Sequence, residues 1–166
     1  SPELLGAPEL AGTVTGNTIE QNRLLHNIGP GVELKGAAGT LVQGNLARLN
    51  GFNGLYLAAG TRGTLVKGNT LVSNVGYGIR SNGADVFGNT WAQNSIYANG
   101  AGGIANTGGG NAGVQAPTLS VQGLTVRGTA APGATVEIFS DNGKQGRFFE
   151  GRVLAGPSGA FSFTAS

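Results

Sequence analysis

The sequence predicts an all-β protein, with a parallel β-solenoid of about four coils followed by a small antiparallel β-sandwich. Three observations support this prediction: a motif recurs four times, short alternating apolar stretches lie between Gly and Asn, and the texture of the sequence changes after residue 115. The chain has 166 residues, 32 of them Gly. No repeat contains an amphipathic stretch long enough for a helix, which argues against a βαβ unit.

The repeat is recognised by a Gly-Asn pair in each copy. A Val stands two residues before each of these Gly residues, and a second Asn follows five residues after the first Asn. A later Gly-aliphatic pair closes the copy. The Gly-Asn pairs are Gly16-Asn17, Gly44-Asn45, Gly68-Asn69 and Gly88-Asn89, and the Gly-aliphatic pairs are Gly31-Val32, Gly54-Leu55, Gly78-Ile79 and Gly103-Ile104.

Each copy has the properties of one solenoid coil. Stretches such as Val32-Glu33-Leu34 and Leu55-Tyr56-Leu57 alternate with the period of a β-strand. Gly and Asn between them tolerate the left-handed conformation that a tight corner needs. The Gly-Asn pairs are 28, 24 and 20 residues apart, and repeat units of this length with short strands and tight corners stack as coils.

Equivalent residues of a solenoid stack about 4.8 Å apart, so the repeat also predicts ladders. Val32, Leu55, Ile79 and Ile104 form one apolar column, and Leu34 stacks on Leu57 in another. A further inward column is predicted from Val14, Val42, Val66 and Val86, and a corner ladder of bonded amides is predicted from Asn22, Asn50, Asn74 and Asn94.

The stretch TLVKGNTLVSNVGYGIRSN, from Thr64 to Asn82, resembles the right-handed parallel β-helix repeat of the pectin-lyase-like superfamily. The resemblance runs from about Gly12 to Gly109 and implies a right-handed β-helix. It implies no particular activity, because that fold carries lyases, hydrolases, tailspikes, adhesins and inert spacers.

The segment after residue 115 has a different character. Strand-like stretches alternate with the turn signals Pro132-Gly133, Asp141-Asn142-Gly143 and Pro157-Ser158-Gly159. Residues Val126 to Gly143, followed by GPSGAFSFTAS, resemble a bacterial Ig-like module of cell-surface proteins. The predicted organisation is a leader, capping or donor strand over 1–11, a parallel β-helix over 12–115 and an Ig-like β-sandwich over 116–166.

The Ig-like resemblance implies two further strands beyond Ser166, so the sandwich is expected to be incomplete. Two alternatives follow. The chain is a portion of a longer protein, or a strand arrives from another molecule and completes the sheet. The segment from Glu3 to Leu10 is a conceivable donor, although Pro8 lacks a backbone N–H.

Composition excludes several classes of function. A net charge of +2 does not favour nucleic-acid binding, and no apolar run reaches the ~20 residues of a membrane span. The chain has no Cys, and its single His26 lacks a second His, so we expect no metal site and no cofactor. The absence of Met indicates a processed or excised chain.

Catalytic residues are not expected. Hydrolysis of a glycosidic bond needs two carboxylates about 5–10 Å apart. The repeat register instead pairs Glu20 with Arg48, places Asp85 beside Leu41 and Leu65, and leaves Trp91 inward beside Ile19, Ala47 and Leu71. The chain is therefore predicted not to be an enzyme.

The best candidate ligand-binding surface is the row Glu33, Tyr56 and Arg80, since each stands two residues after its Gly. An aromatic ring flanked by charged groups suits a sugar, although an ordinary solvated ladder would have the same pattern. We expect a secreted prokaryotic cell-surface protein that self-associates as a stalk, matrix or filament subunit, by stacking of β-helix ends or by strand complementation. The alternative is a carbohydrate-binding adhesin, or a fragment of a polysaccharide lyase or hydrolase whose catalytic coils are missing.

Overall fold

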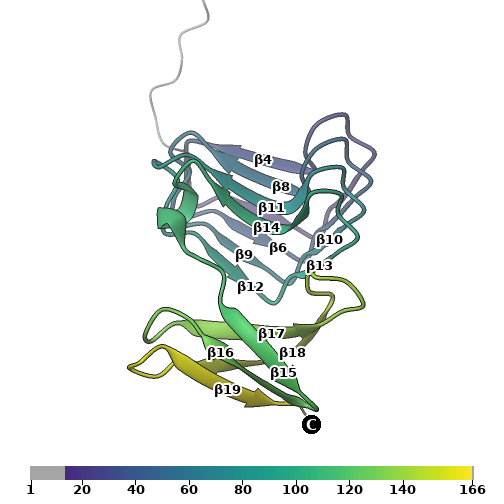
Figure 1. Ribbon diagram of the computed structural model, residues 1–166. Helices are drawn as coiled ribbons and strands as arrows, with labels where there is room; N and C mark the ends of the chain where they lie inside the picture. The colour runs from purple at the N-terminus through teal and green to yellow at the C-terminus, as the bar shows by residue number, and fades with distance from the viewer. Residues whose placement is uncertain (1–13, 166) are drawn as a thin grey trace, which may run out of the picture.

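The computed structural model describes residues 14–165, and it confirms the predicted all-β architecture. Strands β1 to β14 form a parallel β-solenoid of about four coils, and β15 to β19 form a small antiparallel region below it (Figure 1). The predicted leader, residues 1–11, lies outside the described residues.

Each coil contributes one short strand to each of three parallel sheets. The first sheet contains β2 (Thr18–Glu20), β6 (Leu41–Gln43), β9 (Leu65–Lys67) and β12 (Thr90–Ala92). The second contains β3 (Arg23–Leu25), β7 (Leu46–Arg48), β10 (Thr70–Val72) and β13 (Ser95–Tyr97). The third contains β4 (Val32–Lys35), β8 (Leu55–Ala58), β11 (Tyr77–Asn82) and β14 (Gly102–Thr107). A minor sheet pairs β1 (Val14–Thr15) with β5 (Ala37–Ala38).

The core of the solenoid is a set of aliphatic columns that run through the coils. The predicted columns of the third sheet are confirmed, because Val32 pairs with Leu55, Leu55 with Ile79, and Ile79 with Ile104. Leu34 also stacks on Leu57 as predicted. Burial of one such side chain stabilises the fold by about 1.5–3 kcal/mol.

The predicted valine column is wrong, because it combines two separate columns. Val42 pairs with Val66, and this column runs from Ile19 to Trp91. Val14 instead pairs with Ala37, and the neighbouring bridges from Ala38 through Arg62 to Phe87 place Val86 in that same column. Trp91 is inward as predicted, but it stacks on Val66 rather than beside Ala47 and Leu71.

The predicted asparagine ladder likewise combines two separate ladders, because each coil has three similar corners. Its step from Asn50 to Asn74 is confirmed, whereas Asn22 and Asn94 belong to another corner. A residue with positive φ precedes a polar residue at every corner. The first corner ladder contains Asn17, Thr40, Thr64 and Asn89. The second corner ladder contains Asn22, Asn45, Asn69 and Asn94. The third corner ladder contains Asn27, Asn50, Asn74 and Asn99.

In some coils the predicted alignment is displaced by five residues, the distance from one corner to the next. This five-residue slip has a physical cause. Any corner accepts a Gly-Asn pair, because Gly adopts positive φ without strain. Gly16-Asn17 and Gly88-Asn89 form the first corner, whereas Gly44-Asn45 and Gly68-Asn69 form the second. At the second corner of the outer coils, Gln21 and Gln93 adopt positive φ instead, with values of 55° and 52°.

The antiparallel region consists of two small sheets packed face to face. One sheet has the order β15 (Thr118–Gln122), β16 (Thr125–Thr129), β19 (Ala160–Thr164), and the other pairs β17 (Thr135–Ser140) with β18 (Phe148–Leu154). Val136, Ile138 and Phe161 form the buried core between the sheets. A short 3-10 helix, Gly110–Gly113, precedes this region.

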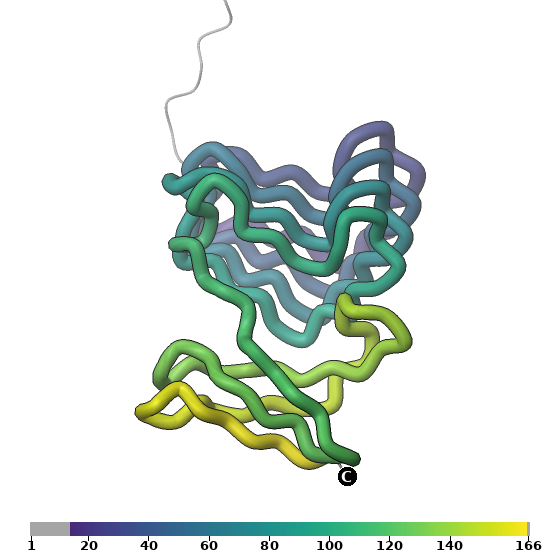
Figure 2. Tube along the Cα trace, in the orientation of Figure 1, coloured from purple at the N-terminus to yellow at the C-terminus, as the bar shows by residue number. Residues whose placement is uncertain are grey.

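The loop between β17 and β18, residues 141–147, returns to the last coil (Figure 2). Ile96 N–H donates to the carbonyl of Gly146 at 2.9 Å, and the Ser95 hydroxyl donates to the carbonyl of Arg147 at 2.7 Å. The guanidinium of Arg147 lies 4.5 Å from the centre of the Tyr97 ring. The loop therefore covers the exposed edge of β13.

Candidate functional site

The predicted row Glu33, Tyr56 and Arg80 lies on the outer face of the third sheet. Glu33 of β4 pairs with Tyr56 of β8, and Tyr56 pairs with Arg80 of β11. The structure therefore brings these three residues together in the predicted order, and the parallel ladder continues to Ala105 of β14.

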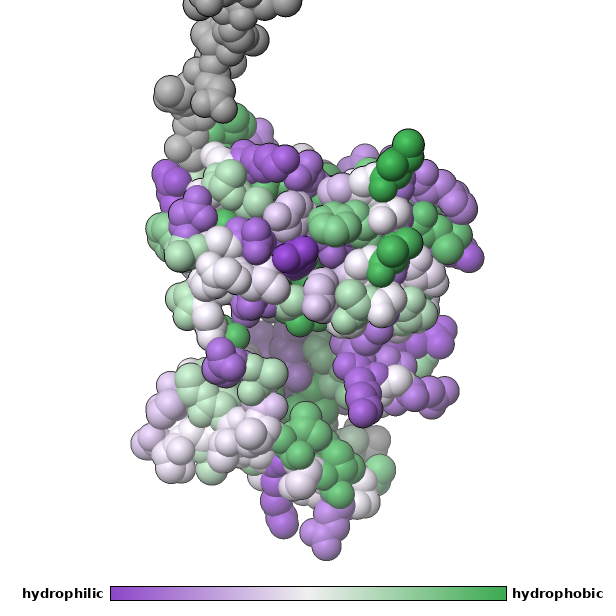
Figure 3. Space-filling model, turned by 45° about the horizontal axis from the view of Figure 1, so that its top comes forward, coloured by the Kyte–Doolittle hydropathy of each residue, from purple (hydrophilic) through white to green (hydrophobic). Residues whose placement is uncertain are grey.

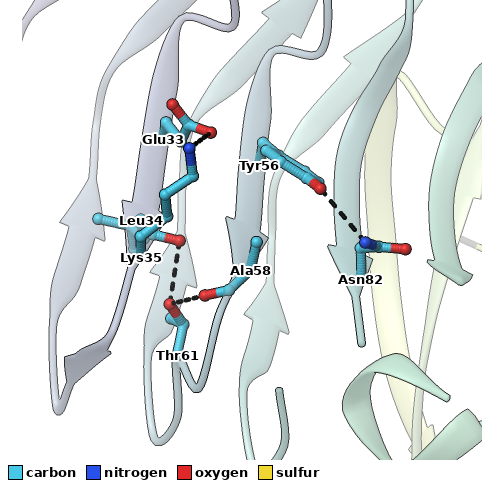
Figure 4. A network of polar contacts seen from close by, with 7 residues as sticks. All are labelled: Glu33, Leu34, Lys35, Tyr56, Ala58, Thr61 and Asn82. Carbon is cyan, nitrogen blue, oxygen red and sulfur yellow. Dashed lines mark hydrogen bonds and ion pairs between the residues drawn. The ribbon is translucent and has the colours of Figure 1, made fainter. Parts of the chain in front are cut away.

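Polar neighbours contact the charged and hydroxyl groups of this row, Lys35 from the same strand and Asn82 and Thr107 from the next strand. Figure 4 shows the contacts of Lys35 and Asn82. Glu33 Oε1 lies 2.8 Å from Lys35 Nζ, and this carboxylate raises the pKa of Lys35 above its ordinary value. Asn82 Nδ2 donates to the Tyr56 hydroxyl at 3.3 Å. Arg80 Nε donates to Thr107 Oγ1 at 3.1 Å.

An aromatic pair lies at the centre of the row. The ring of Phe52, in the bend before β8, meets the Tyr56 ring edge to face at a centroid distance of 5.7 Å. The guanidinium of Arg80 lies 5.9 Å from the Tyr56 ring centre. Both rings are partly exposed, so they offer an apolar surface bordered by charges.

Sequence reasoning missed Lys35, Phe52, Asn82 and Thr107. Lys35, Asn82 and Thr107 stand two residues after Glu33, Arg80 and Ala105 respectively, so extending the row by one strand period would have found them. Phe52 lies in a bend outside the repeat, and no periodic signal indicates its contact with Tyr56.

The predicted partners of two other carboxylates are wrong. Glu20 pairs with Gln43, whose Nε2 donates to Glu20 Oε2 at 2.7 Å, while Arg48 pairs with Leu25. Asp85 immediately precedes Val86, which belongs to the column of Val14 and Ala37, so Asp85 does not stand beside Leu41 and Leu65. Both differences follow from the same five-residue slip.

The acidic side chains of the third sheet bear on whether it could hydrolyse a glycosidic bond. Glu33 is the one carboxylate among its four strands, so the two-carboxylate arrangement of a glycosidase is not formed there. Within residues 14–165 no group of three or more His, Cys, Asp or Glu side chains could hold a metal ion. In that same range, no helix is long and apolar enough to cross a bilayer.

A cleft lies between the last coil and the antiparallel sheets (Figure 3). Its volume is about 740 Å³, and Trp91, Ile96, Ile104 and Phe139 contribute to its walls. Sequence reasoning did not find this cleft, because it forms only when the 141–147 loop docks against the solenoid.

Comparison with known proteins agrees with the architecture. The family model described as "Right handed beta helix region" matches residues 9–119. No curated protein sequence matches the chain. The family match spans every coil of the solenoid, so the chain belongs to the right-handed β-helix family.

Proposed function

We propose that this protein is an extracellular structural subunit of a prokaryotic cell surface, joined to its neighbours by strand complementation. One observation carries the proposal: β17 has an unpaired edge beside apolar side chains that no other strand covers. Across residues 14–165, β17 pairs with β18 alone.

The uncovered side chains belong to the inner face of the three-stranded sheet. Leu119 of β15 pairs with Gly128 of β16, which pairs with the buried Phe161. Paired residues share a face of a sheet, so Leu119 points inward like Phe161. Val121 is on the same face, yet Leu119 and Val121 are both 63% exposed.

The exposure follows from the position of the two-stranded sheet. Gly151 of β18 lies directly against the ring of Phe163 in β19, where an added Cβ would approach to 2.6 Å. The sheet therefore covers β19 and leaves β15 open. A strand added to the free edge of β17 would lie over Leu119 and Val121 and pair its backbone with β17.

The occupant we propose is the segment Glu3 to Leu10 of a second copy. This segment lies outside the described residues. It precedes β1, which is at the solenoid end remote from β17 (Figure 1). A neighbour that approaches head to tail would bring this segment to the free edge of β17. Pro8 is tolerated there, because the added strand forms the edge of the sheet.

Stacking of solenoid ends is a weaker route to assembly. The 141–147 loop and Asn111 already bond to the last coil. A second solenoid could not reach this end without displacing both. Strand complementation requires no such displacement and repeats head to tail, which gives a filament rather than a closed ring.

The test is sedimentation of the full chain across a concentration series, with electron microscopy of the concentrated sample. We expect concentration-dependent association and filaments. Val121→Lys should abolish association, because it places a charge under the added strand. The matched control Val75→Lys changes an equally exposed valine on the solenoid and should associate normally. A wild-type chain that stays monomeric, or two variants that behave alike, would overturn the proposal.

Three related assignments belong to the same proposal. We place the solenoid in the pectin-lyase-like superfamily on its repeat, and we interpret β15 to β19 as five strands of an Ig-like module. We also propose that the protein is secreted. We further propose that it is not an enzyme, since the strands of the third sheet provide one carboxylate.

Binding of a cell-surface polysaccharide is a second candidate function, supported by the Phe52–Tyr56 aromatic pair. Tyr56→Ala should abolish binding on a glycan array, because the sugar would lose its stacking surface. Phe87→Ala is the control, since Phe87 is an exposed aromatic outside the row. An array with no bound glycan for the wild-type chain would contradict this function.

A further inference from the structure

The corner ladders have a direction. In the second corner ladder, the backbone N–H and Nδ2 of Asn45 both donate to Oδ1 of Asn69, at 2.9 and 3.0 Å. Asn69 repeats this fork toward Asn94, at 3.0 and 2.9 Å. Each asparagine thus presents two donors to the coil that follows it.

Two of the three ladders end on a side-chain carboxamide supplied by the chain itself. The first corner ladder ends where Asn89 N–H donates to Asn111 Oδ1 at 2.8 Å, and Asn111 Nδ2 donates back to the Asn89 carbonyl at 2.9 Å. The third ends where Asn99 N–H and Nδ2 donate to Gln145 Oε1 at 3.0 and 3.1 Å. Gln145 Nε2 returns a bond to the Asn99 carbonyl.

The second corner ladder ends differently, at Asn94. This residue is 4% exposed, its Oδ1 accepts from Asn69, and its Nδ2 donates to the Val66 carbonyl at 2.9 Å. No acceptor among residues 14–165 takes its backbone N–H or its second Nδ2 proton. The adjacent Gln93 N–H is occupied by Glu137 Oε2 at 2.7 Å.

Asn94 lies in the wall of the cleft between the last coil and the antiparallel sheets. The coil repeat directs its two donors toward the place of a following coil, and that place is the cleft. The other walls are largely apolar, with Trp91, Ile104 and Phe139 among them. A buried donor pair in an apolar recess of this volume is a usual binding-site arrangement.

We propose that this cleft binds a side-chain carboxamide, the Asn or Gln side chain of an extended apolar peptide. Its carbonyl oxygen would accept from Asn94 N–H and Nδ2, as Gln145 does from Asn99. Its NH2 group has a carboxylate acceptor available at Glu137, which also lies in the cleft wall. That same carboxylate disfavours an anionic ligand, because two nearby like charges repel each other.

The cleft shares β17 with the proposed strand-complementation site, since Thr135, Val136, Glu137 and Phe139 line it, but it involves neither Leu119 nor Val121. A variant that abolishes filaments can therefore retain carboxamide binding. The two proposals are tested by different readouts and different substitutions.

The test is an NMR titration of the full chain with the peptide acetyl-Leu-Gln-Val-amide. We expect saturable shifts of the Asn94 backbone and side-chain amide signals. The matched peptides carry Leu or Glu in place of Gln, and each should bind at least tenfold more weakly. Equal binding of the Leu peptide, or no binding of the Gln peptide, would overturn the proposal.

Two protein variants test the residues. Asn94→Asp keeps an oxygen acceptor for Asn69 but removes the Nδ2 donor, so binding should fall at least tenfold; Asn142→Asp controls for the added charge. Ile104→Trp fills the cleft from a partly exposed position and should block binding without altering the ladder, with Val75→Trp as its control.

One internal competitor must also be examined. Gln115 lies in the cleft wall, where its Nε2 donates to the carbonyl of Gly113 at 2.7 Å. Nuclear Overhauser effects between Asn94 and Gln115 side chains in the free protein would overturn the proposal, because the donor pair would then have an internal acceptor. Their absence, together with saturable binding, would support it.

Discussion

At the scale of single residues, buried asparagines hold the solenoid corners together through hydrogen-bonded ladders. Asn74 accepts from Asn50 N–H and Nδ2, and it donates to Asn99 Oδ1 and to the Ala47 carbonyl. Every one of these groups is buried, so the corner is stable only when all of them find partners.

Replacement of Asn74 by Leu therefore tests the ladder. The substitution keeps the branched four-atom shape of the side chain but removes the acceptor of the Asn50 N–H and Nδ2 groups and the Nδ2 donor to the Ala47 carbonyl, at about 1–3 kcal/mol for each buried group left unpaired. We expect the free energy of unfolding to fall by at least about 3 kcal/mol, measured by denaturant titration. Asn142→Ala, in an exposed turn, should change it by less than about 0.5 kcal/mol. Equal effects would contradict the ladder account.

The ion pair between Glu33 and Lys35 makes a prediction about pH. The hydrogen bond and charge of Glu33 raise the pKa of Lys35 above 10.5, so the contribution of the pair to stability is present below that pH and is lost as the pH rises through the raised pKa. Glu33→Gln should bring the pKa of Lys35 back toward 10.5. An NMR titration of the Lys35 side chain checks this, with Lys67 as the internal reference. An unchanged Lys35 pKa would show that the pair does not form.

At the scale of elements, the sequence predicts the strand columns of the third sheet but not those of the other two. The Gly near the start of each strand of the third sheet is required at that place in the coil, because a side chain there would meet the adjacent coil. An added Cβ on Gly54 would lie 2.8 Å from the Gly78 carbonyl oxygen and 2.9 Å from Asn74 Nδ2. The Gly-aliphatic pair therefore marks one place in each coil, and alignment on it gives the correct register.

The corners carry no such unique mark. Three corners in each coil share the same backbone conformation and a similar polar residue, five residues apart. Alignment on Gly-Asn consequently joined different corners in different coils. The register of the row Glu33, Tyr56 and Arg80 was predicted correctly because the row was aligned on Gly31, Gly54 and Gly78. The contact with Phe52 lies in a bend outside the repeat, and the cleft depends on docking of the 141–147 loop, so neither could be predicted.

Gly54→Ala tests this account of the third sheet. The added methyl would meet backbone that cannot move independently of the adjacent coil, so we expect a loss of at least about 2 kcal/mol in unfolding free energy. Gly29→Ala is the matched control, because no atom lies within 4 Å of an added Cβ there and φ is not positive. It should be neutral or slightly stabilising. Thermal unfolding of both variants measures the difference, and a tolerated Gly54→Ala would refute the packing argument.

At the scale of the whole molecule, the solenoid and the antiparallel sheets form one structure through the 141–147 loop. Gln145 makes three hydrogen bonds with Asn99, and Gly146 pairs with Ile96. The loop therefore supplies part of a further coil, contributed by a segment remote in sequence.

Gln145→Ala should loosen this junction. Loss of its bonds leaves Asn99 N–H and Nδ2 without an acceptor, so hydrogen exchange at the Asn99 and Ile96 amides should accelerate by about tenfold or more, since each 1.4 kcal/mol corresponds to a factor of ten. The amides of β6 and β9, far from the loop, serve as internal references. Gln122→Ala is the matched control in an exposed strand. Unchanged exchange at Asn99 would show that the loop does not stabilise the last coil.

The shared direction of the corner ladders also bears on how such a chain could change in length. Every coil receives the same pair of bonds from the coil before it and offers the same pair to the coil after it. Coils are therefore interchangeable modules, and tandem duplication or loss of one complete turn of about 24 residues, the spacing of bonded asparagines, leaves the last coil compatible with its caps Asn111 and Gln145. Gene duplication could lengthen this protein one coil at a time without any new interface.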